Sequence, residues 1–484
     1  MNIMLNRREF LKFAGGGVAG GMAALVVGNK LSWVLENQAF AATVVQTLDF
    51  RITDAMKEMV THNALNDARC YFWIYKSVTP DLQAEVPGPV IFATRGDTIR
   101  ITLTNDLDEP HAFFIPGVFD SGPIAPGQTV TRSFRANNSG SFLYYDNLNS
   151  PVNRVMGLHG AFIVLPGIRR APNKFTPYDL PTPAVQALFN DLGDAVHWPG
   201  LSWEEADVDP ASLAPAFRQY IWLLHQASPN LFREVGSLPA GELYPAATFV
   251  NAFLRDPFSP TNANRTPQYF TINGQSGSLI HANPHITPNL RVGEPTLIRV
   301  LNAGLWTHSM HLHANHIYVI AVNGVVQANP IWIDVFNSNP LDTWDWLNPY
   351  MRPPDVPNAR GIGMPDTPLM SLSNPLIPGS APHPVWPPIE EINMLIPEGA
   401  TAGGVPGGVP IDVQLSPLCY PEHDHSEPTQ TSQGGNYNLG LIAGMNVTGD
   451  RNIDPAGVTT FPNAPNMWAA NVTRLAAPQM PEHL

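Results

Sequence analysis

The chain has 484 residues, which is long enough for two or three domains with well-buried cores. Its formal net charge of -14, which no basic patch offsets, argues against nucleic acid as a partner. The 50 prolines and 38 glycines, beside only 14% charged residues, favour short strands joined by many turns and long loops.

Residues 1–41 are predicted to be an export signal rather than part of the fold. The segment Arg7-Arg8-Glu9-Phe10-Leu11-Lys12 is followed by an apolar run and then by the small-residue pattern Ala39-Phe40-Ala41. This arrangement resembles a bacterial twin-arginine signal, so we expect a mature periplasmic chain that begins at Ala42. The apolar run contains glycines and ends at Lys30, which makes it short for a stable membrane anchor.

Residues 42–167 are predicted to form a first β domain. Residues 44–50 alternate between apolar and polar side chains, and residues 69–75 form an aromatic run, both of which are typical of strands. A glycine turn at Gly96 leads into an alternating strand that ends at Asn105, and two further strands close the domain near residue 167.

Residues 168–214 are predicted to connect this domain to a second one. Within them, Thr182 caps a predicted helix that starts at Pro183 and reaches Asn190. The second β domain is expected over residues 215–450, with a Pro-rich insertion at 337–388 that is too long for a plain loop and is interpreted as a surface cover. An irregular tail, residues 451–484, follows.

One short sequence pattern occurs in both predicted β domains. A glycine turn followed by a strand that ends in asparagine runs from Gly96 to Asn105, and again, at equal length, from Gly293 to Asn302. The repetition predicts two copies of one β-sandwich type. The fold class is therefore expected to be all-β.

Cys70 and Cys419 are the only cysteines. They lie far apart in sequence, so a single disulfide between them stays open, whereas a scaffold built on disulfides is excluded.

Four of the chain's 15 histidines fall in the nine residues 308–316, in an apolar β-like frame. Residues two apart in a strand point to the same side, so His311 and His313 project together. Neutral imidazoles at this spacing are typical of metal ligands. The alternative is a polar strand edge whose histidines bond to the backbone.

A second pair, His423 and His425, lies more than a hundred residues downstream. Two such pairs could converge on one metal ion or on a metal pair, and imidazole-rich sites suit copper, zinc, iron or nickel. The competing interpretation is a solvated acidic loop, since Glu422, Asp424 and Glu427 surround the second pair.

These residues carry a resemblance to the multicopper oxidases. The segment from His308 to His313 resembles that family's third copper motif, His-Pro-x-His-x-His, whose histidines serve the type 1, type 2 and type 3 coppers in turn. Similar family phrases occur at Pro87-Gly88-Pro89, Gly96-Asp97-Thr98, Gly157-Leu158-His159-Gly160 and Asn273-Gly274. The resemblance covers most of residues 45–450 and is closest to two-domain members and copper nitrite reductases. It implies two cupredoxin-like Greek-key β-sandwich domains with long Pro-rich loops, and copper as the cofactor.

The departures from the family motifs matter for function. The first motif is replaced where Phe114 and Pro116 stand at ligand positions, and the second where the chain reads Tyr144-Tyr145-Asp146-Asn147. The fourth motif, His-Cys-His, appears as His423-Asp424-His425, so the type 1 thiolate is missing and a usual blue-copper centre is not expected. Cys419 is an alternative thiolate, although its spacing differs from that of the motif.

The predicted metal ligands are His308, His311, His313, His423 and His425, with Asp424 or Glu422 able to move protons. A homotrimer or a partner protein would have to complete the site, with His111 and His159 as weaker replacements within the chain. The favoured function is an exported copper-binding oxidoreductase with a reduced histidine site and an unknown electron donor or small substrate. The alternatives are an inactive cupredoxin-fold scaffold and a copper-handling protein of the periplasm.

Overall fold

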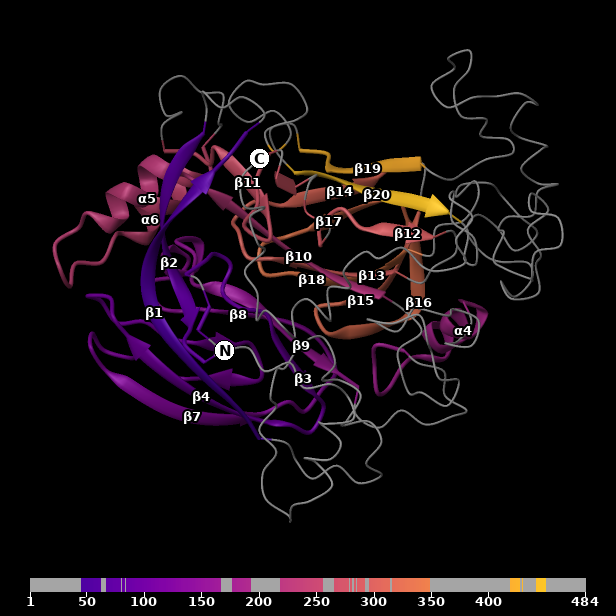
Figure 1. Ribbon diagram of the computed structural model, residues 1–484, viewed down its shortest axis with the longest axis horizontal. Helices are drawn as coiled ribbons and strands as arrows, with labels where there is room; N and C mark the ends of the chain where they lie inside the picture. The colour runs from indigo at the N-terminus through magenta and orange to yellow at the C-terminus, as the bar shows by residue number, and fades with distance from the viewer. Residues whose placement is uncertain are drawn as a thin grey trace, which may run out of the picture.

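The computed structural model describes residues 45–166, 176–192, 218–255, 265–348, 418–426, 429 and 441–449. Short gaps within these ranges fall at 62–66, 80, 83, 278, 281–282, 284, 292–295 and 314–315. The predicted export signal, residues 349–388 of the predicted insertion and the C-terminal tail lie outside the described residues. The described chain is mostly strand, as predicted, and its strands form four sheets, two from each half (Figure 1).

The first sheet has the order β2-β1-β4-β7, made of β1 (Val45–Met59), β2 (Ala68–Ser77), β4 (Thr98–Asn105) and β7 (Thr129–Arg135). β1 is long enough to pair parallel with β4 along its first part and antiparallel with β2 along its second part. β4 buries every second residue, as expected for a strand with one face on a core.

The second sheet has the order β3-β9-β8-β5-β6, made of β3 (Ile91–Thr94), β9 (His159–Leu165), β8 (Gly140–Tyr145), β5 (Phe114–Ile115) and β6 (Phe119–Asp120). The short helix α3 (Val152–Val155) precedes β9. Every residue of β9 is buried. Phe162 and Val164 face the core shared with the first sheet, whereas Ala161 and Ile163 face a core shared with the second half.

The third sheet has the order β11-β10-β13-β18-β15-β16. Its strands are β10 (Arg218–Ala227), β11 (Tyr269–Ile272), β13 (Thr296–Asn302), β15 (Ile317–Val322), β16 (Val325–Ile333) and β18 (Thr343–Asn348). The fourth sheet has the order β12-β20-β19-β14-β17. Its strands are β12 (Asn289–Arg291), β14 (His308–Leu312), β17 (Val335–Ser338), β19 (Leu418–Asp424) and β20 (Ile442–Gly449).

The first and third sheets share one pattern of pairing. In each, a long strand pairs antiparallel with the next strand and parallel with the strand that ends in the repeated asparagine, which then pairs antiparallel with a later strand. β1, β2, β4 and β7 therefore correspond to β10, β11, β13 and β18. The prediction of two copies of one sandwich type from the repeated sequence pattern is confirmed.

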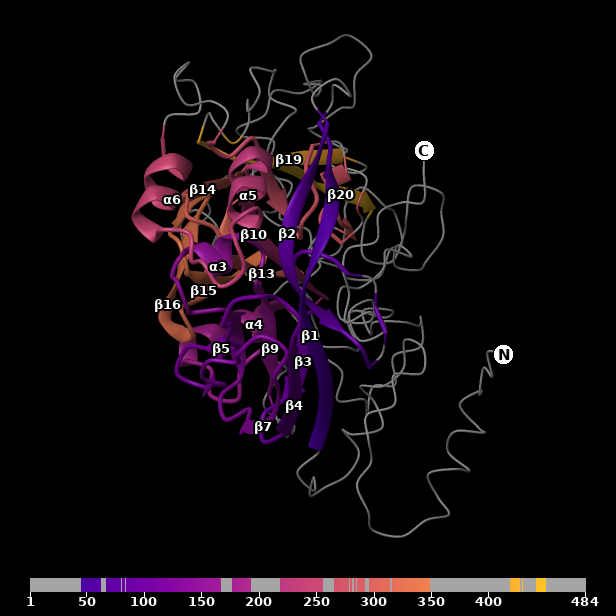
Figure 2. The same cartoon turned by 90° about the vertical axis from the view of Figure 1, so that its left-hand side faces the viewer.

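Three further helices cover the sheets. α4 (Pro183–Leu192) begins at the predicted Pro183 and packs through Val185, Leu188 and Phe189 on β15 and β18. α5 (Pro229–Gly236) and α6 (Ala246–Phe253) lie between β10 and β11 in sequence and were not predicted. α5 lies against β2 of the first half, where the rings of Phe232 and Phe72 meet edge to face at 5.5 Å (Figure 2).

The predicted Pro-rich insertion starts too early. Residues 335–348 contain β17 and β18, and β18 is an inner strand of the six-stranded sheet. The prediction was wrong there because Asn339 and Pro340 make only the turn between two short strands. The aromatic residues that follow form β18, in which Trp346 is buried against Trp222.

Candidate metal centre

Two neighbouring strands carry the histidines that the sequence singled out. β14 and β19 pair antiparallel inside their sheet, and their register places His311 directly opposite His423. Residues directly opposite in an antiparallel pair point to the same face. The pairing continues past the strand ends, where the backbone N–H groups of His313 and His425 bond to the neighbouring strand. Two His-x-His pairs from distant parts of the sequence therefore meet on one face.

The four imidazole rings form one cluster. The ring centroid of His311 lies 5.0 Å from that of His313, 5.5 Å from that of His423 and 4.8 Å from that of His425. The ring of His423 lies 4.8 Å from that of His313. The donor nitrogens of His311, His313 and His423 all lie within 4.8 Å of one another. His313 and His425 are exposed and the other two are half-buried, so the cluster faces solvent.

Backbone carbonyls orient two of these rings. Nδ1 of His311 donates to the carbonyl of Asp334 at 3.0 Å, and Nδ1 of His423 donates to the carbonyl of Asp424 at 3.0 Å. Both Nε2 atoms are then unprotonated, and Nε2 of His423 lies 2.7 Å from Nε2 of His313. Metal-bound histidines are commonly held by such a bond from their other nitrogen. The donor set therefore fits a metal ion that prefers imidazole.

Partial burial favours the neutral form of two histidines of the cluster, His313 and His423. Partial burial, followed by the neighbouring histidines, lowers the pKa of His313. Partial burial also lowers the pKa of His423, against the opposing effect of its bond to Asp424. An imidazole must be unprotonated to bind a metal, so the lowered pKa values favour binding at neutral pH.

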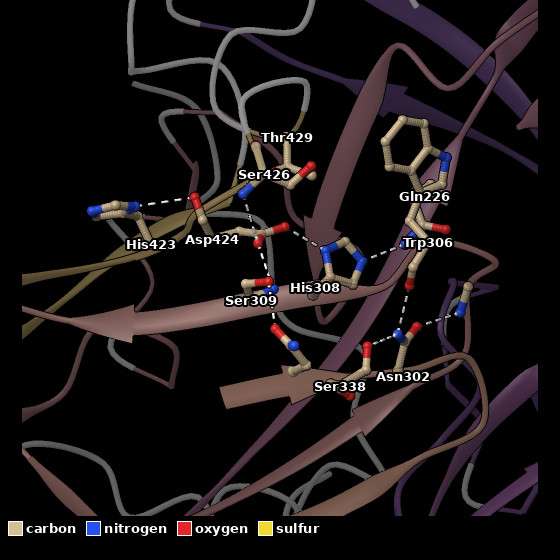
Figure 3. Close-up of polar contacts among 12 residues, drawn as sticks. Gln226, Asn302, Trp306, His308, Ser309, Ser338, His423, Asp424, Ser426 and Thr429 are labelled. Atoms are coloured by element: carbon tan, nitrogen blue, oxygen red, sulfur yellow. Dashed lines mark hydrogen bonds and ion pairs between the residues drawn. The ribbon is translucent and has the colours of Figure 1, made fainter. Parts of the chain in front are cut away.

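His308 lies apart from the cluster, on the buried face of β14. Its Nδ1 donates to Oδ2 of Asp424 at 2.6 Å, and its Nε2 lies 2.6 Å from Nε2 of Gln226 (Figure 3). Because Oε1 of Gln226 accepts from the backbone N–H of Leu305, its amide nitrogen faces His308 and donates to it. Both ring nitrogens of His308 are thus occupied by protein groups. The structure differs here from the prediction, which grouped His308 with the metal ligands.

Asp424 also faces the core rather than the cluster. Side chains alternate along β19, so His423 points to one face while Glu422 and Asp424 point to the other. Burial alone would raise the pKa of Asp424. The attraction and hydrogen bond of His308, together with bonds from the backbone N–H groups of Ser309 and Ser426, lower it instead. Asp424 is therefore an ionised structural residue that links β14 to β19.

Glu422 is fully buried, and neither of its carboxyl oxygens has a hydrogen-bond partner among the described residues. Burial, followed by the charge of Asp424, raises its pKa well above the ordinary value, so the carboxyl is neutral. The expectation that Asp424 or Glu422 moves protons at the metal is not supported by this arrangement, because both lie on the opposite face of the strand. The carboxylate of Asp334, 3.7 Å from Nδ1 of His311, is on the correct side.

One of the two cysteines, Cys70, lies in the first half of the chain, away from the histidine cluster. Cys70 is a buried free thiol in the first half, and burial raises its pKa, so the unreactive thiol form dominates. Cys419 lies on β19 four residues before His423. Its side chain lies outside the part of the chain that the structure describes, so Cys419 as an alternative thiolate stays a prediction.

The two weaker candidates of the first half are core residues. His159 is fully buried and donates from Nδ1 to the carbonyl of Arg154. Its ring lies tilted against that of His225, with centroids 4.3 Å apart. Burial lowers its pKa to about 3. His111 is fully buried and pairs with Asp146 at 2.7 Å. The sequence analysis did not identify Asp146 and Gln226 as histidine partners. His111 follows Asn105 by six residues and His308 follows Asn302 by six residues, and this equal spacing could have indicated that the two histidines occupy equivalent positions.

None of the helices within the described ranges is long and apolar enough to cross a membrane.

Comparison with known proteins gives one family match. Residues 77–168 match the family model described as multicopper oxidase. The matched segment runs from the end of β2 through β9, and so contains every strand of the second sheet of the first half.

Three curated relatives illustrate the sequence similarity. A copper-containing nitrite reductase of Pseudomonas chlororaphis is 34% identical over 19% of this chain and 29% of its own length. The copper-containing nitrite reductase of Alcaligenes xylosoxydans xylosoxydans is 29% identical over 29% of this chain and 43% of its own length. Laccase-9 of Arabidopsis thaliana is 23% identical over 74% of this chain and 54% of its own length. The matched parts are therefore less than two thirds of each relative.

Structural comparison matches this chain to a blue copper oxidase from Nitrosomonas europaea, with a TM-score of 0.47 and 16% sequence identity. The match covers 83% of this chain and 86% of the oxidase. A copper nitrite reductase from the same organism has a TM-score of 0.44 and 16% identity over 88% of this chain and 99% of that one.

Proposed function

We propose that this chain is a copper-binding oxidoreductase with a reduced, all-histidine site, related to the multicopper oxidases whose family model matches residues 77–168. The proposed ligands are His311, His313, His423 and His425. The observation that carries the proposal is the convergence of three of these histidines, whose donor nitrogens lie within 4.8 Å of one another.

The donor chemistry supports copper. Copper binds imidazole more tightly than most divalent metals do, and the curated relatives include copper-containing enzymes. The carbonyl bonds from Nδ1 of His311 and His423 direct the Nε2 atoms of these residues into the cluster. A copper ion held there would supply a redox centre or a Lewis acid. The chain's own contribution is to orient the rings of His311 and His423 and to favour the neutral form of His313 and His423. The carboxylate of Asp334 is near enough to take up a proton.

A usual type 1 centre is not part of the proposal. Asp424 stands where the family motif has cysteine, and its carboxylate is already paired with His308. Gln226 occupies the second nitrogen of that histidine. Without a thiolate and with His308 engaged, electrons would have to reach the cluster directly from a small substrate or a donor protein.

The solvent exposure of the cluster favours one alternative function, the handling of copper without catalysis. His313 and His425 are exposed, so copper at this site could be passed to another molecule without turnover. The same exposure would allow a second subunit of a homotrimer, or a different protein, to complete the coordination. A copper-handling role and an oxidoreductase role therefore share one site and differ in whether bound copper cycles between oxidation states.

The export route is also proposed. The paired arginines at Arg7-Arg8 and the small residues before Ala42 support delivery to the periplasm by the twin-arginine route. N-terminal sequencing of protein recovered from the periplasm of a bacterial host should find Ala42 as the first residue. Recovery of the full-length chain from the cytoplasm alone would contradict the proposal.

Metal analysis with electron paramagnetic resonance tests the copper site. Protein folded with copper is expected to retain it without an intense blue absorption, because no thiolate ligand is present. His311→Ala and His423→Ala should each lose most of the copper. His316→Ala is the matched control, because this histidine belongs to the same sequence cluster but stacks on Trp332 instead. Absence of bound copper in the unsubstituted chain, or ligand variants that bind as much copper as the unsubstituted chain, would refute the proposed site.

A further inference from the structure

The two halves share a polar turn that places one histidine in each. β4 ends at Asn105 and β13 ends at Asn302, and a histidine follows six residues later in both halves, at His111 and His308. Each asparagine donates to the carbonyl four residues further on and accepts from the N–H two residues further on. The local structure that positions the two histidines is therefore duplicated.

Each of these histidines is paired with a buried aspartate. Nδ1 of His111 lies 2.7 Å from Oδ2 of Asp146, and Nδ1 of His308 lies 2.6 Å from Oδ2 of Asp424. In both aspartates Oδ1 accepts the backbone N–H two residues further on. All four side chains are fully buried. Each imidazole is therefore held with its proton on Nδ1, which leaves Nε2 as an acceptor.

The halves differ at that second nitrogen. In the second half, Gln226 donates its amide to Nε2 of His308. In the first half, Nε2 of His111 faces Oε1 of Glu109 at 3.8 Å, and neither atom has a hydrogen-bond partner within the described residues. Burial raises the pKa of the Glu109 carboxyl to about 7, and once that carboxyl is ionised both facing atoms are acceptors. An unsatisfied buried acceptor costs of order 1–3 kcal/mol. A positively charged ligand between them would remove both penalties.

A small pocket at the surface is lined in part by Glu109. Its lining combines three carboxylates and three aromatic rings, from Asp108, Glu109, Glu242, Tyr71, Trp73 and Tyr244. Trp73, which also lines the pocket, packs edge-on against His111 with ring centroids 5.1 Å apart. Arg265, which contacts Tyr244, is neutralised by its ion pair with Glu234. The local charge therefore favours a cation.

We infer that His111 and Glu109 bind a divalent transition-metal ion, at a site separate from the four-histidine cluster. An imidazole nitrogen with a carboxylate oxygen suits zinc-like and copper-like ions. Asp146 orients the imidazole as carboxylates do behind metal-bound histidines. Water from the pocket completes the coordination. With two protein donors, this site binds more weakly than the cluster.

The second half shows how the site can be closed without disrupting the fold. Glu109→Gln would point an amide at Nε2 of His111, as Gln226 does at His308, and the change conserves volume. The full chain is used, with His311→Ala and His423→Ala in every sample so that the cluster no longer binds metal. Cobalt(II) and zinc(II) are added in turn, with cobalt absorption and equilibrium dialysis as readouts.

The background chain is expected to bind one cobalt(II) ion with the absorption of a nitrogen- and oxygen-ligated metal. Glu109→Gln should weaken binding at least about tenfold while the melting temperature stays the same or rises, since the amide satisfies His111. Glu242→Gln, which changes a carboxylate of the pocket lining only, should retain binding. No binding by the background chain, or equal binding by Glu109→Gln, would overturn the inference and leave a water molecule between the two acceptors. These measurements do not depend on whether the cluster binds copper.

Discussion

At the residue scale, Asp424 connects the two strands that carry the candidate copper ligands. Its carboxylate accepts bonds from His308 and from the backbone N–H of Ser309 on β14, and from the N–H of Ser426 beyond β19. These bonds fix the register in which His311 faces His423. Asp424 therefore links β14 to β19 beneath the cluster.

Replacing Asp424 by asparagine tests that role. Asp424→Asn removes the charge from a fully buried hydrogen-bonded pair. If the new amide group faces Nδ1 of His308, two N–H donors are brought together without an acceptor. We expect a loss of roughly 3–5 kcal/mol in the free energy of unfolding, measured with urea, together with weaker copper binding. Asp334→Asn is the control, because that carboxylate is about half exposed and its loss should cost less than about 1 kcal/mol. Equal stabilities of the two variants would show that Asp424 does not hold β14 and β19 together.

Because His159 is buried in its neutral form, we expect the free energy of unfolding to fall as the pH is lowered. Its pKa falls from 6.5 to about 3 in the fold because burial disfavours the charged ring. A base with a lowered folded pKa binds fewer protons folded than unfolded, so its contribution is complete above pH 6.5 and is lost as the pH falls toward 3. The loss approaches about 1.4 kcal/mol per pH unit. His159→Asn, which can keep the bond to Arg154, should reduce the slope of unfolding free energy against pH by about one proton. An unchanged slope between pH 6 and pH 4, the range over which the two pKa values differ, would contradict this assignment.

Spacing in the sequence identified the histidine cluster but not the partners of each histidine. His311 and His313 share a face because strands alternate, and this follows from the sequence alone. The same alternation places Glu422 and Asp424 on the face of β19 that points away from the cluster. The prediction that these two carboxyls move protons at the metal overlooked this consequence. Gln226 bonds to His308 from 82 positions away, and no local pattern indicates such a contact.

At the element scale, the helix α5 joins the halves by lying on β2. Leu231, Phe232 and Val235 make its buried face, and Phe232 meets Phe72 of β2. The helix was missed because eight residues give too short an apolar pattern, although Ser228-Pro229 is a usual start signal. α4 was predicted correctly because Thr182 and Pro183 provide the same signal before a longer apolar stretch. β18 was misassigned because prolines on either side concealed a strand rich in tryptophan.

Gly236, the last residue of α5, tests this contact. A Cβ atom at this position would overlap the ring of Tyr71, which is held by a bond from its hydroxyl to Asp54. Gly236→Ala should therefore displace α5 from β2 and lower the free energy of unfolding by about 1–3 kcal/mol, although alanine favours helix. Ser237→Ala, at the exposed next position, should change stability by less than about 0.5 kcal/mol. A stabilised Gly236→Ala variant would show that helix propensity outweighs the clash.

At the scale of the whole molecule, the sheet that contains β9 is a middle layer. It buries one face against the first sheet and the other against the second half, so neither half could separate without exposing apolar strands. The sequence predicted two sandwiches from the repeated sequence pattern. It did not predict how closely they pack, because the fully apolar pattern of β9 is equally expected of a strand inside one domain.

This middle layer predicts that the two halves unfold together. Polar contacts reinforce the apolar ones: Nη1 of Arg154 donates to the carbonyls of Ala303 and Gly304 at 2.6 and 2.7 Å, and Oγ of Ser276 donates to the carbonyl of Val60. Calorimetry should give one transition, with the calorimetric enthalpy equal to the van't Hoff enthalpy. Arg154→Met removes the bonds but keeps much of the volume, and should lower the melting temperature while preserving the single transition, since the apolar layer remains. Two resolved transitions in the unsubstituted chain would mean that the shared core is too weak to couple the halves. Two transitions in Arg154→Met alone would mean that the coupling depends on Arg154 rather than on β9.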